Sequence, residues 1–96
     1  MIVSFGDKAT EALFHGRPSK QARRLPQDVA RVAVRKLDML NAARTLGDLR
    51  SPPGNYLEVL HGDLTGFHSI RVNDQWRLVF QWTGSDAYEV RLVDYH

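Results

Sequence analysis

The order of apolar and polar residues predicts two helices followed by a series of strands. The first helix is expected over residues 8–15, "KATEALFH", because Asp7 is a good N-cap and Gly16 suits a helix end. The second is expected to start at Pro26, since proline is favoured at a first helical position. Its apolar residues, Val29, Val32, Ala33, Leu37, Leu40 and Ala43, recur at helical spacing. This stripe predicts a face that docks on a sheet.

Later segments alternate between apolar and polar residues, which is typical of half-buried strands. The predicted strands cover residues 56–60, 67–72, 76–82 and 87–93, and "IVSF" at residues 2–5 predicts a short opening strand. The links between the last four strands are short, as in "NDQ" and "TGSD". Consecutive strands should therefore pair antiparallel, because parallel pairing needs long crossovers.

Two segments lack this periodicity. Residues 17–26, "RPSKQARRLP", predict a basic loop that carries Lys20, Arg23 and Arg24. Residues 46–55, "LGDLRSPPGN", concentrate turn-forming residues between the second helix and the strands.

Strand alternation also predicts which side chains share a face of the sheet. One set is expected to meet the helices: Leu57, Val59, Ile70, Val72, Trp76, Leu78, Phe80 and Trp82. Glu58, Arg71 and Arg77 should then emerge together on the opposite face. In the last strand, Tyr88, Val90 and Leu92 are expected on one face and Glu89, Arg91 and Val93 on the other.

These elements predict one α+β domain over residues 1–96, with two helices packed on one face of a mainly antiparallel sheet of four to five strands. Of the residues, 43% are hydrophobic and 25% charged, as in ordinary globular domains. No apolar run approaches the roughly 20 residues that cross a bilayer, and the first residues do not resemble a signal peptide. We expect a cytoplasmic protein with no membrane contact.

The residue types present exclude some chemistries. The chain has no cysteine, so it has no disulfide, thiolate metal site or cysteine nucleophile. Its four histidines are not spaced as zinc ligands, and we therefore expect no metal and no cofactor. Residues 1–55 carry 10 Lys or Arg against 5 acids, whereas residues 56–96 carry 3 against 6. This asymmetry favours a basic surface for a polyanion, although a solvated helix face explains it equally well.

The strand residues and the chain end together contain the groups that metal-free RNA cleavage needs. Glu58 or Asp94 could take the 2′-hydroxyl proton, and His96 or Tyr95 could protonate the departing 5′-oxygen. Arg77 and Arg71 could hold the phosphate through bidentate guanidinium contacts. Each group also has a structural explanation: the arginines could pair with Glu58 across strands, Tyr95 could close the core, and the tail could be frayed.

Three stretches of the chain resemble the HigB-type toxins of bacterial toxin-antitoxin pairs, specifically their GraT-like branch within the RelE-like superfamily. They are "MIVSF" at the start, "SIRVNDQWRLVF" over residues 69–80 and "DYH" at the end, and the resemblance covers nearly the whole chain. It implies a RelE-like fold and an endoribonuclease that cuts messenger RNA in the ribosomal A site. By position, it implies functional roles for Arg77, Asp94, Tyr95 and His96.

The resemblance also implies partners. One partner is ribosomal RNA, which Lys20, Arg23 and Arg24 would contact. The other is a HigA-like antitoxin with a helix-turn-helix domain, in a complex that could be a heterotetramer. The chain departs from the family where other members carry a His and a Lys, because it has Glu58 and His61 there. Which group acts as the base stays open, and His61 could instead contact the phosphate. A non-catalytic module that binds RNA or protein is the alternative.

Overall fold

The structure is a computed structural model that describes residues 1–94, so Tyr95 and His96 lie outside the described residues. Helices α1 (Lys8–His15), α2 (Lys20–Arg23) and α3 (Gln27–Ala42) come first. Two short 3-10 helices, η1 (Leu46–Arg50) and η2 (Pro53–Asn55), lead to strand β1 (Glu58–Val59). The 3-10 helix η3 (Gly62–Leu64) precedes β2 (Phe67–Arg71), β3 (Trp76–Thr83) and β4 (Asp86–Asp94).

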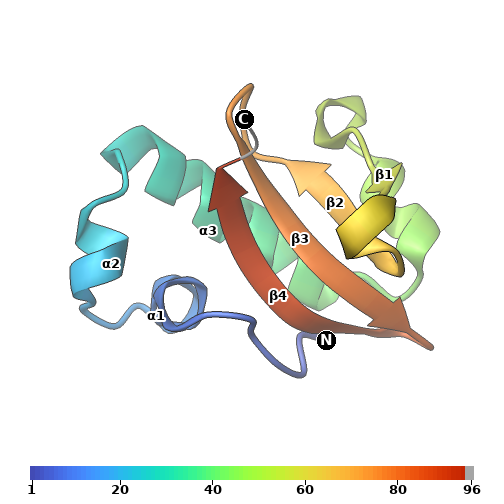
Figure 1. Cartoon of the computed structure of the whole chain (residues 1–96), viewed down its shortest axis with the longest axis horizontal. Helices are drawn as coiled ribbons and strands as arrows, with labels where there is room; N and C mark the ends of the chain where they lie inside the picture. The colour runs from blue at the N-terminus through green and yellow to red at the C-terminus, as the bar shows by residue number, and fades with distance from the viewer. Residues whose placement is uncertain (95–96) are drawn as a thin grey trace.

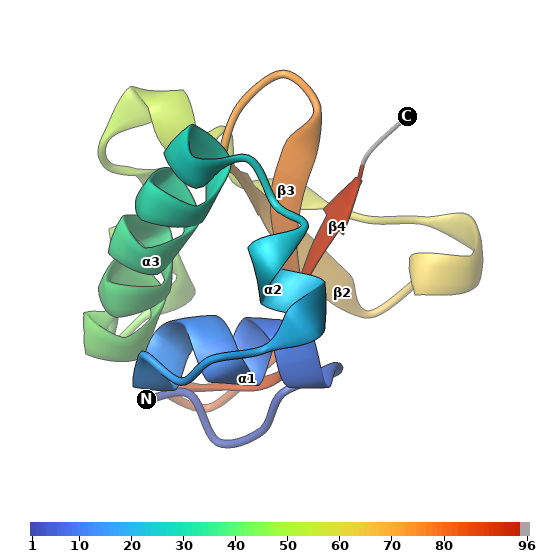
Figure 2. The same cartoon turned by 90° about the vertical axis from the view of Figure 1, so that its left-hand side faces the viewer.

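The four strands form one antiparallel sheet in the order β1-β2-β3-β4, which confirms the predicted meander and the α+β class. Helix α3 covers one face of this sheet, and η3 projects on the other side (Figures 1 and 2). Helix α1 packs beside β4 and α3. In the described part of the chain, no helix is both long and apolar enough to span a membrane.

Both predicted helices are present, with local signals that explain their ends. The side chain of Asp7 accepts a 2.7 Å hydrogen bond from the Thr10 amide, and Gly16 ends α1 with a φ of 67°. Helix α3 begins at Gln27, one residue later than predicted, with Pro26 as its N-cap. The predicted basic loop was partly wrong, because Ser19 caps the additional short helix α2 within it.

One predicted strand is shorter in the structure, and another is replaced by isolated bridges. The strand predicted over residues 56–60 is reduced to Glu58–Val59, because Tyr56 adopts a φ of 43° and ends η2. The opening residues form no regular strand: Ile2 and Phe5 make isolated parallel bridges to Ala87 and Val90 of β4.

The core lies between α3 and the covered face of the sheet. It contains the predicted stripe of α3 and the predicted strand residues, including Val29, Ala33, Leu37, Leu40, Ile70, Leu78, Phe80 and Val90. Val59 was predicted to join them but is 61% exposed. The physical reason is that β1 is a two-residue edge strand. Its outward position leaves Val59 beside the core instead of within it.

A β-bulge in β4 corrects another prediction. Glu89 has a φ of 55°, and it lies with Val90 opposite the single residue Phe80. The extra residue reverses the alternation, so Tyr88 pairs with Gln81 on the face opposite Val90. Ser4 supports the bulge, since its hydroxyl accepts a 2.9 Å hydrogen bond from the Glu89 amide.

Candidate active site

The face of the sheet opposite α3 gathers charged side chains from all four strands. The register places Glu58 opposite Ser69, Ser69 opposite Val79, and Val79 opposite Arg91. Because paired residues project to the same side, these four form one row across the sheet. Arg71, Arg77 and Val93 form the adjacent row. The prediction that Glu58, Arg71 and Arg77 share this face is confirmed.

Glu58 and Arg77 form an ion pair across the sheet. A guanidinium nitrogen of Arg77 donates to Glu58 Oε1 at 3.2 Å. The Arg77 side chain is 15% exposed and that of Glu58 is 48% exposed. The pair joins β1 to β3 and passes over Ser69 of β2. The half-exposed carboxylate of Glu58 therefore lies beside the largely buried guanidinium of Arg77. A substrate phosphate can approach this pair from solvent.

Arg71 lies directly opposite Arg77 and has its own partners. It forms an ion pair with Asp74 in the β2–β3 turn, and its guanidinium lies 5.2 Å from the centre of the Tyr56 ring. The register places two arginines opposite each other, and each is paired with a carboxylate. Guanidinium groups in this arrangement suit bidentate contacts with a phosphate.

Two further residues on this face were not selected from the sequence. The Ser69 hydroxyl is buried and has no hydrogen-bond partner among the described residues. The Arg91 guanidinium lies 6.0 Å from the centre of the Phe67 ring, and its Nε is buried without a partner in the described part of the chain. The alternation of β4 grouped Arg91 with Val93, which pairs with Arg77, so that signal could have identified Arg91 once the strand register was known.

Asp94 is not brought together with the Glu58–Arg77 pair. It pairs with Trp76 and therefore has the parity of the α3 side of the sheet. It accepts a 3.0 Å hydrogen bond from the side-chain amide of Gln75. The proposed roles of Tyr95 and His96 lie outside the described residues.

The predicted RNA-binding residues occupy separate places. His61 is exposed and precedes η3, in the connection between β1 and β2. Lys20, Arg23 and Arg24 are exposed on or directly after α2. Helix α2 lies beyond β4, at the opposite end of the molecule from β1 (Figure 1). These three cations are therefore remote from Glu58.

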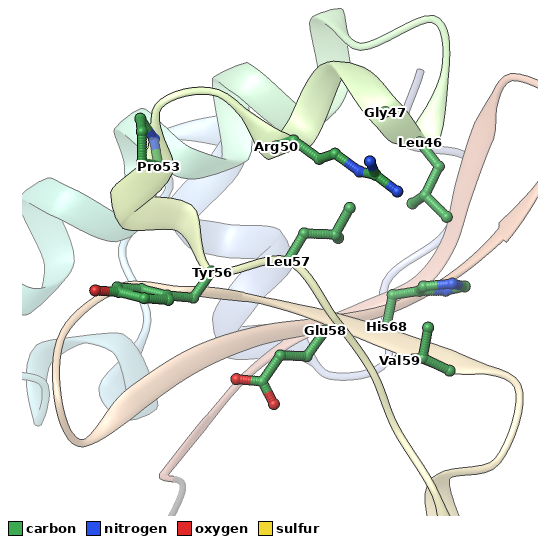
Figure 3. A pocket seen from close by; sticks show the side chains of 9 residues that line it. All are labelled: Leu46, Gly47, Arg50, Pro53, Tyr56, Leu57, Glu58, Val59 and His68. Carbon is green, nitrogen blue, oxygen red and sulfur yellow. The ribbon is translucent and has the colours of Figure 1, made fainter.

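A cavity of about 360 Å³ lies along the other side of β1, between that strand and η1. Its lining consists of Leu46, Gly47, Arg50, Pro53, Tyr56, Leu57, Glu58, Val59 and His68 (Figure 3). His68 stacks on the core residue Phe80, and burial lowers the pKa of its imidazole. Within residues 1–94, no three His, Asp or Glu side chains cluster closely enough to hold a metal ion.

Residues 3–96 match the family described as the RelE-like toxin HigB of type II toxin-antitoxin systems. The chain is 42% identical to Toxin HigB-1 of Vibrio cholerae over 92 residues, which is 96% of this chain and 95% of that protein. It is 36% identical to Endoribonuclease HigB of Proteus vulgaris over 101 aligned positions that cover both proteins fully.

Among solved structures, the fold matches the YoeB-YefM complex from Staphylococcus aureus with a TM-score of 0.62. That match covers 100% of this chain and 98% of the other at 16% identity, so it shows a common fold. The family match over residues 3–96, together with the two HigB relatives, shows that this chain belongs to the HigB family of RelE-like toxins of type II toxin-antitoxin systems.

Proposed function

We propose that this chain is an endoribonuclease that cuts messenger RNA in the ribosomal A site, without a metal ion. One observation carries the proposal: a half-exposed carboxylate, Glu58, is ion-paired with Arg77 on an open sheet face, and Arg71 lies directly opposite that arginine. The relative from Proteus vulgaris, which is named an endoribonuclease, supports the same reaction.

The proposed chemistry is an attack by the 2′-hydroxyl on the adjacent phosphorus. Glu58 accepts the hydroxyl proton while the bond from O2′ to phosphorus forms. The bond from phosphorus to O5′ then breaks, and the products are a 2′,3′-cyclic phosphate and a 5′-hydroxyl end. Arg77 and Arg71 stabilise the negative charge on the pentacovalent phosphorus. Such electrostatic stabilisation of the transition state is usually the largest contribution to catalysis.

The 5′-oxygen needs a proton as it departs, and His96 or Tyr95 is proposed to supply it. His61 is proposed to contact a phosphate next to the scissile one, since it stands exposed in the connection that follows Glu58 and β1. Asp94 is assigned no proton transfer, because its position in β4 gives it the parity of the opposite face.

Ribosome binding is assigned to the exposed cations of α2, Lys20, Arg23 and Arg24. Because contacts with phosphate groups provide most sequence-independent affinity for RNA, this cluster suits ribosomal RNA. Its distance from β1 lets the toxin hold the ribosome with one end and the messenger with the other (Figure 1).

The partner is proposed to be a HigA-like antitoxin with a helix-turn-helix domain, assembled with the toxin as a heterotetramer in the cytoplasm. Membership of a toxin-antitoxin family supports an antitoxin. The fold neighbour from Staphylococcus aureus supports it too, because that structure is a complex of YoeB with YefM.

The test compares naked messenger RNA with the same messenger on programmed ribosomes, in the presence of a chelator. Wild-type protein should cut only the ribosome-bound message, and Glu58→Gln should slow single-turnover cleavage by roughly 10²-fold or more. Glu11→Gln is the matched control, since Glu11 is exposed on α1. Equal cutting of both substrates would refute ribosome dependence, and ribosome binding without any cleavage would support a non-catalytic module.

A further inference from the structure

The cavity along β1 combines an apolar floor with polar groups that lack partners. Leu46, Leu57 and Val59 line it with hydrocarbon, and the Arg50 side chain extends over it from η1 (Figure 3). Its volume of about 360 Å³ is in the range of small-ligand sites. In the described part of the chain, Arg50 makes no ion pair and no side-chain hydrogen bond.

His68 contributes the second unsatisfied group. Its Nδ1 is buried and has no hydrogen-bond partner among residues 1–94. Because this nitrogen has no accessible surface, it faces the packed side of the ring, and the cavity is lined by other atoms of the imidazole. Burial lowers the pKa of His68, which favours the neutral form of the ring.

The wall that carries Arg50 is well fixed. The Asp48 carboxylate accepts hydrogen bonds of 3.0 Å and 3.1 Å from the amides of Arg44 and Thr45, and these bonds lower the pKa of Asp48. The Thr45 hydroxyl in turn accepts a bond from the Asp48 amide, which completes a capping box at the start of η1. The cavity is therefore a preformed feature of the fold.

The cavity adjoins the Glu58–Arg77 pair at the edge of the sheet. Glu58 and Val59 are consecutive residues of β1, so their side chains project to opposite faces, and Figure 3 shows the Glu58 carboxylate directed away from Arg50 and His68. Strand β1 has no neighbour on its outer side among the strands of the described chain. An extended RNA chain that passes over this edge meets the ion pair first and the cavity next.

We propose that this cavity is a nucleobase subsite, which holds the base of the nucleotide adjacent to the scissile phosphate. The base lies against Leu57, Val59 and the ring of His68, and Arg50 contacts its face or phosphate. Single-stranded RNA is recognised through such unstacked bases. An apolar antitoxin side chain would leave Arg50 without a partner, whereas RNA supplies both an aromatic base and a phosphate for the guanidinium, so this cation favours RNA. This inference rests on the proposed function, since it assigns a subsite to the same substrate.

The test blocks the cavity with a side chain that the backbone tolerates. Gly47 lines the cavity, and an added Cβ there would meet only the Thr45 hydroxyl, at 3.7 Å. Gly54 is the matched control, because it lies in η2, outside the lining, and an added Cβ would meet nothing within 4 Å. The probe is a fluorescent hexanucleotide with 2′-O-methyl groups, which lacks the attacking hydroxyl and cannot be cut.

Gly47→Leu should weaken binding of this probe by about 10-fold, because a stacked base contributes on the order of 1–3 kcal/mol. Gly54→Leu should change it less than twofold. An equal response to both substitutions, or no response to either, would overturn the inference. A Gly47→Leu protein that binds RNA normally but has lost antitoxin binding would assign the cavity to the protein partner and would overturn it as well.

A second pair of variants tests the inference independently, in case the Gly47→Leu protein does not fold. Arg50→Ala removes an exposed cation at the cavity, and Arg44→Ala removes an exposed cation that is not part of the lining. Only Arg50→Ala should weaken probe binding by more than about threefold at fixed salt. In NMR, the probe should also shift the resonances of the His68 ring, which lines the cavity, and unshifted ring resonances at saturation would contradict the subsite.

The subsite and the proposed function can fail separately. If Glu58→Gln abolishes cleavage while Gly47→Leu changes neither binding nor cleavage, the subsite is wrong and the nuclease assignment stands. If Gly47→Leu blocks probe binding while Glu58→Gln cuts normally, the subsite stands and the proposed catalytic role of Glu58 fails.

Discussion

Glu58 and Arg77 are 19 residues apart and belong to strands that are not neighbours, yet Glu58 Oε1 lies 3.2 Å from the Arg77 guanidinium. The contact exists because both residues have the same parity as the intervening Ser69 of β2. Because the Glu58 end of this ion pair is half-exposed to solvent, the pair contributes only on the order of 1 kcal/mol to folding. Its position on an open face, beside Arg71, gives it more importance for phosphate chemistry than for stability.

The rate of RNA cleavage should depend on the planar geometry of the Arg77 guanidinium as well as on its charge. Arg77→Lys keeps the positive charge but cannot make a bidentate contact with phosphate while also donating to Glu58. Single-turnover cleavage on programmed ribosomes should fall by roughly 10²-fold, with little change in ribosome affinity. Arg31→Lys, at an exposed position of α3, should behave as wild type. A fully active Arg77→Lys protein would show that only the charge is needed.

Isosteric substitutions should show whether Glu58 or Asp94 is the catalytic base. Glu58→Gln removes the proton acceptor beside Arg77, whereas Asp94→Asn alters a residue with the opposite parity that bonds to Gln75. We expect a loss of roughly 10²-fold for Glu58→Gln and a much smaller loss for Asp94→Asn. Rates of message cutting on ribosomes measure both, and the reverse order would make Asp94 the base.

The basic cluster of α2 should set the salt dependence of ribosome binding. Replacement of Lys20, Arg23 and Arg24 together by Gln should lower the slope of log affinity against log salt by about 1 for each charge removed. The control replaces Arg31, Arg35 and Arg44, which are exposed elsewhere on the molecule. Equal slopes for the two triple variants would mean that net charge, and not this cluster, governs binding.

The buried contact between Lys36 and Asn55 should stabilise the fold. Lys36 is 7% exposed and donates to the Asn55 side chain, whose amide donates to Leu49 O at 3.1 Å and to Ser51 O at 3.3 Å. Burial, followed by the charge of Arg35, lowers the pKa of Lys36.

Asn55→Leu should therefore lower the free energy of unfolding by about 2 kcal/mol, because it leaves the buried Lys36 ammonium group without its hydrogen-bond acceptor. Adding Lys36→Met should restore part of this loss. Urea unfolding of the two variants measures both effects, and a double variant less stable than Asn55→Leu would count against the explanation.

Stability should decrease in mild acid because of His68. Burial lowers the pKa of this imidazole, so below about pH 6.5 the unfolded chain binds more protons than the folded chain. The free energy of unfolding should thus fall as the pH drops from about 6.5 through the lowered folded-state pKa. His68→Phe, which keeps an aromatic ring on Phe80, should reduce this slope. Identical slopes between about pH 7.5 and about pH 5.5 would exclude His68 as the cause.

Sequence periodicity predicted the elements whose signals are local. Capping by Asp7 and Gly16, the stripe of α3 and the alternation of β2 and β3 depend on neighbours within a few residues, and the structure confirms each. Alternation also placed Glu58, Arg71 and Arg77 on one face, because antiparallel pairing with short links leaves little freedom of register.

Tertiary structure decided everything that depends on contacts between distant segments. The bulge at Glu89 is stabilised by Ser4, which lies 85 residues away, so no local pattern in β4 could show that Tyr88 changes face. The exposure of Val59 follows from the edge position of β1, and the cavity beside it is lined jointly by residues of η1, β1 and β2. Residue types and spacing determined which groups this protein can use, whereas three-dimensional packing determined which of them meet, because side-chain proximity depends on the fold and not on distance along the chain.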